Sequence, residues 1–517
     1  MPEITRRTLL AGLVAASGGL APAMAQQSAE PAKPPPTFGY DDVVKRARDL
    51  AGAPFDAQVA PLPDSLSRLD FDAWRDIRFH SDKPLLGPGS PFRLELFHLG
   101  HLYKRPVTVN VLRDGLPAPV PYAGNLFDYG RNRIDGALSV NLGFAGFRLH
   151  YPLNAPHVMD EVIAFLGASY YRFLGRGQRY GLSARGLAIG AGEQEEFPFF
   201  REFWIDTPPP GAERAVVHGL LDGESATGAF RFEIYPGMET SVEVTATLFA
   251  RRAIPALDMA PLSSMFLAGK NDHRFDDDFR NELHDSDGLL IHAGSGEWIW
   301  RPLSNPAQPA ISAFLDKDVR GFGLLQRDRS FEHYQDLDLA YELRPSYWVE
   351  PREAWGEGRV GLVELPTRDE SNDNIVASWT PRDAIAAGRS LTYGYRITAL
   401  MNDARLTPGA RAINTWRTTP RALGSAELLP AGGTRFLIDF SGGDLAYFLG
   451  DPSMVEIVPT TSVGRITRSF LAPNTHVRGF RAAIDVQIDP GQSCDLRVFL
   501  RGANRALTET WTFPWRA

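Results

Sequence analysis

The chain has 517 residues, a formal net charge of −8 at pH 7 and a single cysteine, Cys494. Nucleic acid and anionic lipid recruit clustered Lys and Arg, so this charge balance favours neither partner, and one cysteine excludes an internal disulfide. With 48 Gly, 40 Pro and 11% aromatic residues, the composition favours many short elements separated by turns over long helices.

The first 25 residues are predicted to be a signal peptide of the twin-arginine type. Arg6 and Arg7 precede an apolar run at 9–20, and the segment 23–25 (Ala-Met-Ala) has the small residues of a cleavage site. A membrane-spanning helix needs about 20 apolar residues, so this run is too short to favour a permanent anchor. We therefore expect an exported periplasmic protein that does not span the membrane.

Residues 26–37 are polar and rich in proline, which predicts a disordered lead-in. Residues 40–50 place apolar side chains at helical spacing and predict one helix. Beyond it, apolar and β-branched residues alternate at period two, as in half-buried antiparallel strands. The clearest of these segments are 92–97, 107–112, 230–235 and 241–249. We predict a large β-sandwich over 38–400 that contains the substrate cleft.

The alternating pattern lapses between 401 and 433, where Pro, Gly, Ala and Arg are frequent, and we predict an interdomain linker there. Strand patterns resume over 434–517 and predict a small immunoglobulin-like sandwich without paired cysteines. The predicted strands are 434–440, 454–459, 466–470, 480–488 and 494–500. The expected fold class is therefore all-β, a large sandwich followed by a small one.

Acidic residues and an imidazole gather in the segment 284–288 (His-Asp-Ser-Asp-Gly). The structural alternative is an Asx turn in which each aspartate caps backbone amides. An EF-hand is not favoured, because the glycine comes two positions too early. Zinc, serine-hydrolase and phosphate-loop motifs are absent from the sequence, so no cofactor and no metal are predicted.

Two indoles follow on one face of a predicted strand, at Trp298 and Trp300, with Arg301 beside them. Aromatic faces stack on sugar rings and arginine donates to hydroxyls, which suits a glycan site. Burial of both rings in the core is the alternative.

Further clusters of carboxylates, aromatics and arginines occupy 327–346 and 366–374. A general acid and a general base, commonly Asp or Glu, can cleave a glycosidic bond without any cofactor. These clusters are therefore compatible with carbohydrate hydrolysis.

Several long segments resemble the periplasmic glucan biosynthesis proteins, the OpgG and OpgD (MdoG and MdoD) family. The signal peptide favours the OpgD-like members. The resemblance covers the chain from Phe38 nearly to its end and implies a galactose mutarotase-like sandwich followed by an immunoglobulin-like one. The matching segments are 165–170, 180–186, 284–289, 296–303, 320–328, 344–346 and 374–377.

The resemblance also implies work on osmoregulated periplasmic glucan, whose backbone is β-1,2-linked glucose, as an anomer-inverting endo-β-1,2-glucanase. Asp373 would be the general acid and Asp285 the general base. An acid must keep its proton near neutral pH, so we expect an anionic or dry setting for Asp373, with Asp369 and Glu370 as candidate sources of repulsion. The residues expected to contact sugar are Tyr341, Arg344, Glu370, Ser371, Trp298, Trp300, Arg301, His284 and Asp287.

Two alternatives share the resemblance: a transglycosylase that closes β-1,2-glucan rings, and a non-catalytic glucan-binding partner of the inner-membrane glucan synthase. A sugar epimerase is a third, suggested only by the mutarotase-like fold, and fold analogy is weak support for a function.

Overall fold

The structure is a computed structural model that describes residues 37–134, 138–273, 278–420 and 433–516. The predicted signal peptide and nearly all of the predicted lead-in lie outside the described residues. In the part that is described, no helix is long and apolar enough to cross a membrane.

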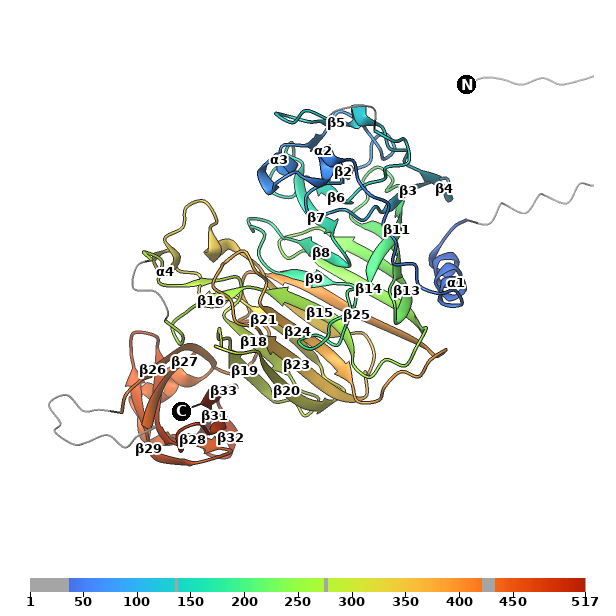
Figure 1. The fold of residues 1–517 in the computed structure, drawn as a ribbon. Coiled ribbons are helices and arrows are strands. Elements are labelled where there is room, and N and C mark those ends of the chain that lie inside the picture. Colours follow the sequence, from blue (N-terminus) through green and yellow to red (C-terminus); the bar gives the residue numbers. More distant parts are fainter. Residues whose placement is uncertain (1–36, 135–137, 274–277, 421–432, 517) are drawn as a thin grey trace, which may run out of the picture. The chain divides into compact units, whose positions relative to one another are not determined.

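The predicted helix is confirmed as α1 (Tyr40–Ala51), with Asp41 and Asp42 in its first turn and Arg48 in its last. Both placements suit the helix dipole. Its buried residues Val43 and Ala47 pack on the outward side of a large sheet, where Figure 1 shows α1 beside β13. The remaining helices are short: α2 (Asp64–Ser67), α3 (Phe71–Arg75), α4 (Phe331–Tyr334), η1 (Gly124–Leu126), η2 (Tyr341–Leu343), η3 (Leu445–Gly450) and η4 (Pro452–Met454).

Two large sheets form the first sandwich, which confirms the all-β class (Figure 1). The strands of the ten-stranded sheet are β2 (Arg93–Phe97), β6 (Gly146–Tyr151), β7 (Asp160–Leu166), β8 (Tyr170–Phe173), β9 (Ser183–Arg185), β10 (Ala188–Ile189), β15 (Leu257–Ser264), β20 (Ala310–Lys317), β23 (Glu357–Glu364) and β24 (Ile375–Pro381). Two small pairs accompany the sheets: β1 (Arg78–Phe79) with β5 (Phe127–Asp128), and β16 (Phe266–Ala268) with β17 (Leu283–His284).

The second large sheet extends through the first sandwich into the C-terminal one. The strands that face the ten-stranded sheet are β3 (Thr108–Arg113), β4 (Leu116–Pro119), β11 (Phe199–Asp206), β12 (Ala215–Asp222), β13 (Ala226–Tyr235), β14 (Ser241–Ala250), β18 (Gly288–His292), β19 (Trp298–Pro302), β21 (Gly321–Leu325), β22 (Ser346–Pro351) and β25 (Ser390–Leu400). Its C-terminal strands are β28 (Val455–Thr461), β31 (Ser493–Gly502), β32 (Arg505–Ala506) and β33 (Thr510–Arg516).

Aromatic side chains fill the space between the two large sheets. Phe147 and Phe165 of one sheet lie against Phe203 of the other, with ring centroids 5.0 and 5.4 Å apart. Phe173 stacks on Tyr347 at 4.4 Å. Aromatic rings contribute large buried areas, so this dry core supplies much of the stability that a chain without disulfides needs.

The C-terminal sandwich pairs the end of the long sheet with a four-stranded sheet. Its strands are β26 (Arg411–Thr418), β27 (Gly433–Ser441), β29 (Arg465–Asn474) and β30 (Gly479–Gln487). The segment 401–433, predicted to be a linker, thus contains β26, which pairs with β27. Part of that segment, 421–432, lies outside the described residues.

Backbone hydrogen bonds and a shared apolar core join the two sandwiches. β33 pairs in parallel with β19, with Trp511 opposite Trp300. One apolar cluster contains Trp300 and Trp348 from the first sandwich and Phe436 from the second. The C-terminal sandwich is therefore packed onto the first one through shared hydrogen bonds and buried apolar surface.

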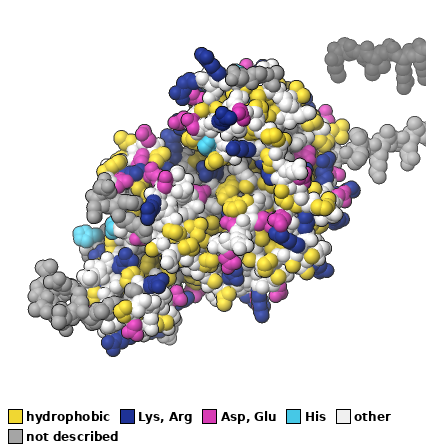
Figure 2. Space-filling view, in the orientation of Figure 1, with side chains coloured by type: hydrophobic (Ala, Val, Ile, Leu, Met, Phe, Trp, Pro, Cys, Tyr) yellow, Lys and Arg dark blue, Asp and Glu magenta, His cyan; other side chains and the backbone are white. Residues whose placement is uncertain are grey.

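Figure 2 shows one face of the molecule, where Lys and Arg side chains alternate with Asp and Glu around apolar areas. The basic side chains on this face form no continuous stripe of the kind that tracks a phosphate backbone.

Candidate functional site

The two aspartates predicted as acid and base come from loops that are far apart in sequence. Asp285 lies between β17 and β18, and Asp373 lies in the loop that precedes β24. The charge of Asp285 acts on Asp373, and so does the guanidinium of Arg344. The fold therefore brings both aspartates and Arg344 into one site, which we call the Asp285–Asp373 site.

Asp285 is buried and held on two sides. Its backbone N–H donates to the carbonyl of Met265 at 2.9 Å, and its carboxylate accepts a hydrogen bond from the Arg344 guanidinium in an ion pair. That guanidinium lies over the Tyr341 ring, 3.8 Å from its centroid. A cation that is fixed between a ring and a carboxylate orients the carboxylate.

Asp373 has a different setting. Its side chain keeps 30% of its surface exposed, and its Oδ2 lies 4.0 Å from Nη2 of Arg172. Burial is the main cause that raises the pKa of Asp373; Arg172 opposes the rise, and the nearby charge of Asp285 adds to it. A raised pKa is the direction that a proton donor needs.

The expected sources of repulsion on Asp373 are replaced by other contacts. Asp369 accepts a hydrogen bond from the backbone N–H of Ser371 at 2.7 Å. Glu370 accepts from the Tyr341 hydroxyl at 3.0 Å and from Arg280 at 2.9 Å. Glu370 is therefore paired with Tyr341 and Arg280. The negative charge that raises the pKa of Asp373 by repulsion is that of Asp285.

The loop that carries Asp373 is anchored through the next residue, Asn374. The Asn374 side chain accepts from the backbone N–H of Phe266 at 2.8 Å and donates to the carbonyls of Phe266 at 3.0 Å and Leu365 at 2.9 Å. Two of these bonds tie the end of the loop to β16, which pairs with β17, the strand that leads to Asp285, and the third ties it to Leu365, directly after β23.

His284, a predicted sugar contact, is fully buried. Its Nδ1 lies 2.7 Å from the Gln326 amide oxygen and its Nε2 lies 2.9 Å from a Glu282 carboxylate oxygen, so both ring nitrogens donate. Burial alone would lower the pKa of His284, but the hydrogen bond and charge of Glu282 outweigh it and raise the pKa. His284 is thus fully buried with protein groups at both ring nitrogens, and no atom of it is exposed for the predicted contact with sugar.

Asp287 also turns inward. Its Oδ2 accepts from the backbone N–H groups of Arg327 at 3.0 Å and Asp328 at 2.9 Å. This matches the turn-capping alternative for the segment 284–288 more closely than a sugar contact.

The structure also bears on the predicted sugar contacts of the two indoles and Arg301. Trp300 is 4% exposed, since it lies in the apolar cluster that includes Phe436 of the second sandwich and the Arg327 guanidinium lies over its ring. Trp298 stacks on His292 at 4.0 Å and on Trp348 at 5.8 Å. Arg301 is buried and donates to Glu364 at 2.6 Å. Trp300 and Arg301 are therefore buried at the junction between the sandwiches, which is the alternative considered from the sequence, whereas Trp298 is half-buried and its contact with sugar stays a prediction.

Two arginines in the site escaped the sequence analysis. Arg172 on β8 faces Asp373, and Arg280 pairs with Glu370 and with Asp336. Each stands alone in an otherwise ordinary strand or loop pattern, so only tertiary contact reveals it. Ser371, by contrast, was predicted and lies exposed beside Glu370.

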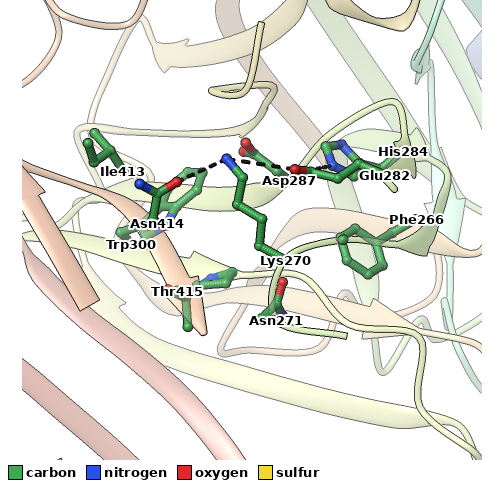
Figure 3. A pocket seen from close by; sticks show the side chains of 12 residues that line it. Phe266, Lys270, Asn271, Glu282, His284, Asp287, Trp300, Ile413, Asn414 and Thr415 are labelled. Atoms are coloured by element: carbon green, nitrogen blue, oxygen red, sulfur yellow. Dashed lines mark hydrogen bonds and ion pairs between the residues drawn. The ribbon is translucent and has the colours of Figure 1, made fainter. Parts of the chain in front are cut away.

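One group among the described residues has the spacing of a metal site: Glu282, Asp328 and His333. Lys270 forms ion pairs with both carboxylates. Figure 3 shows Lys270 reaching between Glu282 and Asn414 in the small cavity that these residues line. An ammonium already supplies the positive charge there, so this cluster is an ion network of the protein.

Fold and site together define an all-β protein of two sandwiches with an acidic pair held among arginines and a tyrosine. The family model described as "Periplasmic glucan biosynthesis protein, MdoG" matches residues 38–515, and the chain belongs to this family.

The names of similar proteins agree with this family membership. "Probable glucans biosynthesis protein D" of Shewanella oneidensis is 42% identical over 485 residues, which cover 92% of this chain and 88% of the relative. "Glucans biosynthesis protein G" of Ralstonia nicotianae is also 42% identical over 485 residues, covering 92% and 95%. The protein of the same name from Pseudomonas paraeruginosa is 40% identical over 487 residues, covering 92% of each chain. Identity therefore does not separate the D and G types here.

Proposed function

We propose that the protein takes part in periplasmic glucan biosynthesis as an anomer-inverting endo-β-1,2-glucanase that acts in the periplasm. Membership in the periplasmic glucan biosynthesis family supports glucan as the substrate. The observation that carries the reaction is the contrast between the two aspartates: Asp373 has a raised pKa, whereas Asp285 is ion-paired with Arg344. Two carboxyls in opposite settings are what acid and base roles require.

In this mechanism Asp373 gives its proton to the leaving glycosidic oxygen. Asp285 accepts a proton from the attacking water, directly or through an intervening water or sugar hydroxyl, and the configuration at the anomeric carbon inverts. Arg172 faces Asp373, so its charge stabilises the carboxylate that remains after the proton has left.

Substrate contacts belong to the residues around this pair. Tyr341 and Arg344 form a stacked unit, and Glu370 with the exposed Ser371 offers acceptors and donors to sugar hydroxyls. The predicted roles of these four residues remain part of the proposal.

The decisive experiment incubates the purified protein with linear β-1,2-glucan and follows new reducing ends together with the anomer formed first, by proton NMR. We expect reducing ends and an initial α-anomer, since the substrate is β-linked. An initial β-anomer would contradict inversion. Cyclic products without new reducing ends would identify the ring-closing transglycosylase, and binding without any product would identify a non-catalytic partner of the glucan synthase.

Export is tested separately. Mass spectrometry of the periplasmic fraction should find a mature chain that begins near Gln26, and an intact N-terminus in that fraction would contradict the predicted cleavage.

A further inference from the structure

The tripeptide Gln326–Arg327–Asp328, which follows β21, contacts both the C-terminal sandwich and the segment that carries Asp285. We propose that the C-terminal sandwich is a positioning element of the Asp285–Asp373 site, coupled to Asp285 through the Arg327 side chain. The inference rests on the proposed hydrolytic function and assigns a role in it to the second sandwich.

Towards the proposed base, the tripeptide forms hydrogen bonds with residues on both sides of Asp285 in the segment 284–287. The Gln326 side chain accepts from His284 Nδ1 at 2.7 Å and donates to the His284 carbonyl at 2.9 Å. The backbone N–H groups of Arg327 and Asp328 donate to the Asp287 carboxylate. Residues on both sides of Asp285 are thus bonded to the tripeptide, so a shift of the tripeptide would move the base.

On the other side, the Arg327 guanidinium enters the C-terminal sandwich. It donates to both carboxylate oxygens of Glu509, at 2.6 and 3.0 Å, and to the carbonyl of Ala412 in β26 at 2.9 Å. Asp403, just before that sandwich, accepts from it at 2.8 Å. The guanidinium also lies 3.6 Å from the ring centroid of Trp300.

Burial makes this coupling stiff. The side chains of Arg327 and Glu509 are 4% and 0% exposed, so the pair is shielded from solvent. Bidentate arginine–carboxylate pairs have a fixed geometry, and a buried charge without its partner is strongly disfavoured. Arg327 can therefore leave its place only if the whole junction opens.

A second link runs parallel to the first. Lys270 forms ion pairs with Asp328 and Glu282, and donates to the Asn414 side chain of β26 at 2.9 Å (Figure 3). Glu282 in turn holds His284. The C-terminal sandwich thus reaches the residue before Asp285 by a route independent of Arg327.

The test compares two full-length variants that each remove one ion pair between the sandwiches. Glu509→Gln weakens the Arg327 clamp but keeps the shape of the side chain and an acceptor for Arg327. Arg497→Gln removes the exposed pair of Arg497 with Glu297, at 2.6 Å, which contacts no residue of the tripeptide. Steady-state kinetics on linear β-1,2-glucan is measured for both variants.

For Glu509→Gln we expect kcat to fall roughly tenfold with KM within about twofold, because misplacement of a reacting group by a fraction of an ångström affects the chemical step. Arg497→Gln should keep both constants. An unchanged kcat in folded Glu509→Gln, or an equal loss in Arg497→Gln, would overturn the coupling. If Glu509→Gln does not fold, Asp403→Asn, which removes only one of the two anions, takes its place.

Hydrogen exchange separates this inference from the proposed function. Amides of residues 283–288 should exchange faster in Glu509→Gln than in the parent protein and in Arg497→Gln, whether or not glucan is cleaved. Unchanged exchange there would overturn the positioning role, whereas an inactive parent protein would overturn only the proposed hydrolysis.

Discussion

The segments that carry the two aspartates of the site are built in opposite ways. In 284–287, His284 makes two hydrogen bonds with Gln326, Asp287 makes two with Arg327 and Asp328, and the carboxylate of Asp285 has a guanidinium partner. In 369–373, the side chains of Asp369, Ser371 and Asn372 are exposed. The comparison indicates that the segment of the base is held by more hydrogen bonds to the rest of the fold than the loop that carries the acid.

The largest expected effect is on turnover. Asp373→Asn and Asp285→Asn should each lower kcat on β-1,2-glucan by about 10²- to 10⁴-fold, because each removes a proton-transfer group. Glucan binding, measured by calorimetry, should remain. Asp369→Asn is the control in the exposed loop and should keep kcat within about twofold. Turnover at parental levels in both variants would refute the assignment and leave the family membership intact.

The next effect is on stability and falls on the segment of the base. His284→Ala should lower the free energy of unfolding by about 2–4 kcal/mol in urea titrations, since it removes the buried hydrogen bonds to Gln326 and Glu282 and leaves Lys270 as the partner of Glu282. Asp369→Ala, in the exposed loop, should cost under about 1 kcal/mol. Similar losses in the two variants would remove the contrast between the segments.

Asn374 tests where the exposed loop becomes rigid. Asn374→Ala should cost about 1–3 kcal/mol, because the backbone groups of Phe266 and Leu365 lose their partners in a buried place. The neighbouring Asn372→Ala serves as control, since Asn372 is exposed and should change stability little. Equal effects in urea titrations would mean that the loop has no anchor at Asn374.

Local pattern predicted the fold well where elements depend on near neighbours. The helix at 40–50 and the alternating strand at 241–249 are present as α1 and β14. The sequence could not predict that Trp300 is covered, because the apolar cluster around it includes Phe436 and other residues more than a hundred positions further along the chain. A strand pattern shows which side chains share a face and leaves open what packs on that face.

The site shows the same limit. The family resemblance named Asp285, Tyr341, Arg344, Glu370 and Asp373, and the structure brings these five residues together. Arg172 carries no motif and reaches Asp373 only because β8 and β24 lie in the same sheet, separated by β9 and β15. Whether these residues perform the proposed chemistry stays a prediction.

The smallest effect concerns the pH dependence of stability, and it has opposite signs in two aspartates of one loop. The pKa of Asp373 is raised in the folded protein, chiefly by burial. As pH rises through the ordinary value of 3.8, the unfolded chain ionises first, so Asp373 lowers stability increasingly until its folded pKa is passed. The pKa of Asp369 is lowered by the backbone N–H of Ser371, so its contribution is present above 3.8 and is lost as pH falls.

Melting temperatures between pH 4.0 and 7.5 should therefore diverge. Asp373→Asn should melt at or above the parent protein at pH 7.5, with the advantage shrinking toward pH 4, because asparagine does not ionise where the folded protein disfavours the charge. Asp369→Asn should melt slightly below the parent at pH 7.5 and approach it toward pH 4. Parallel curves for the two variants would mean that Asp373 is as well solvated as Asp369, and an acid role for Asp373 would then lack its physical basis.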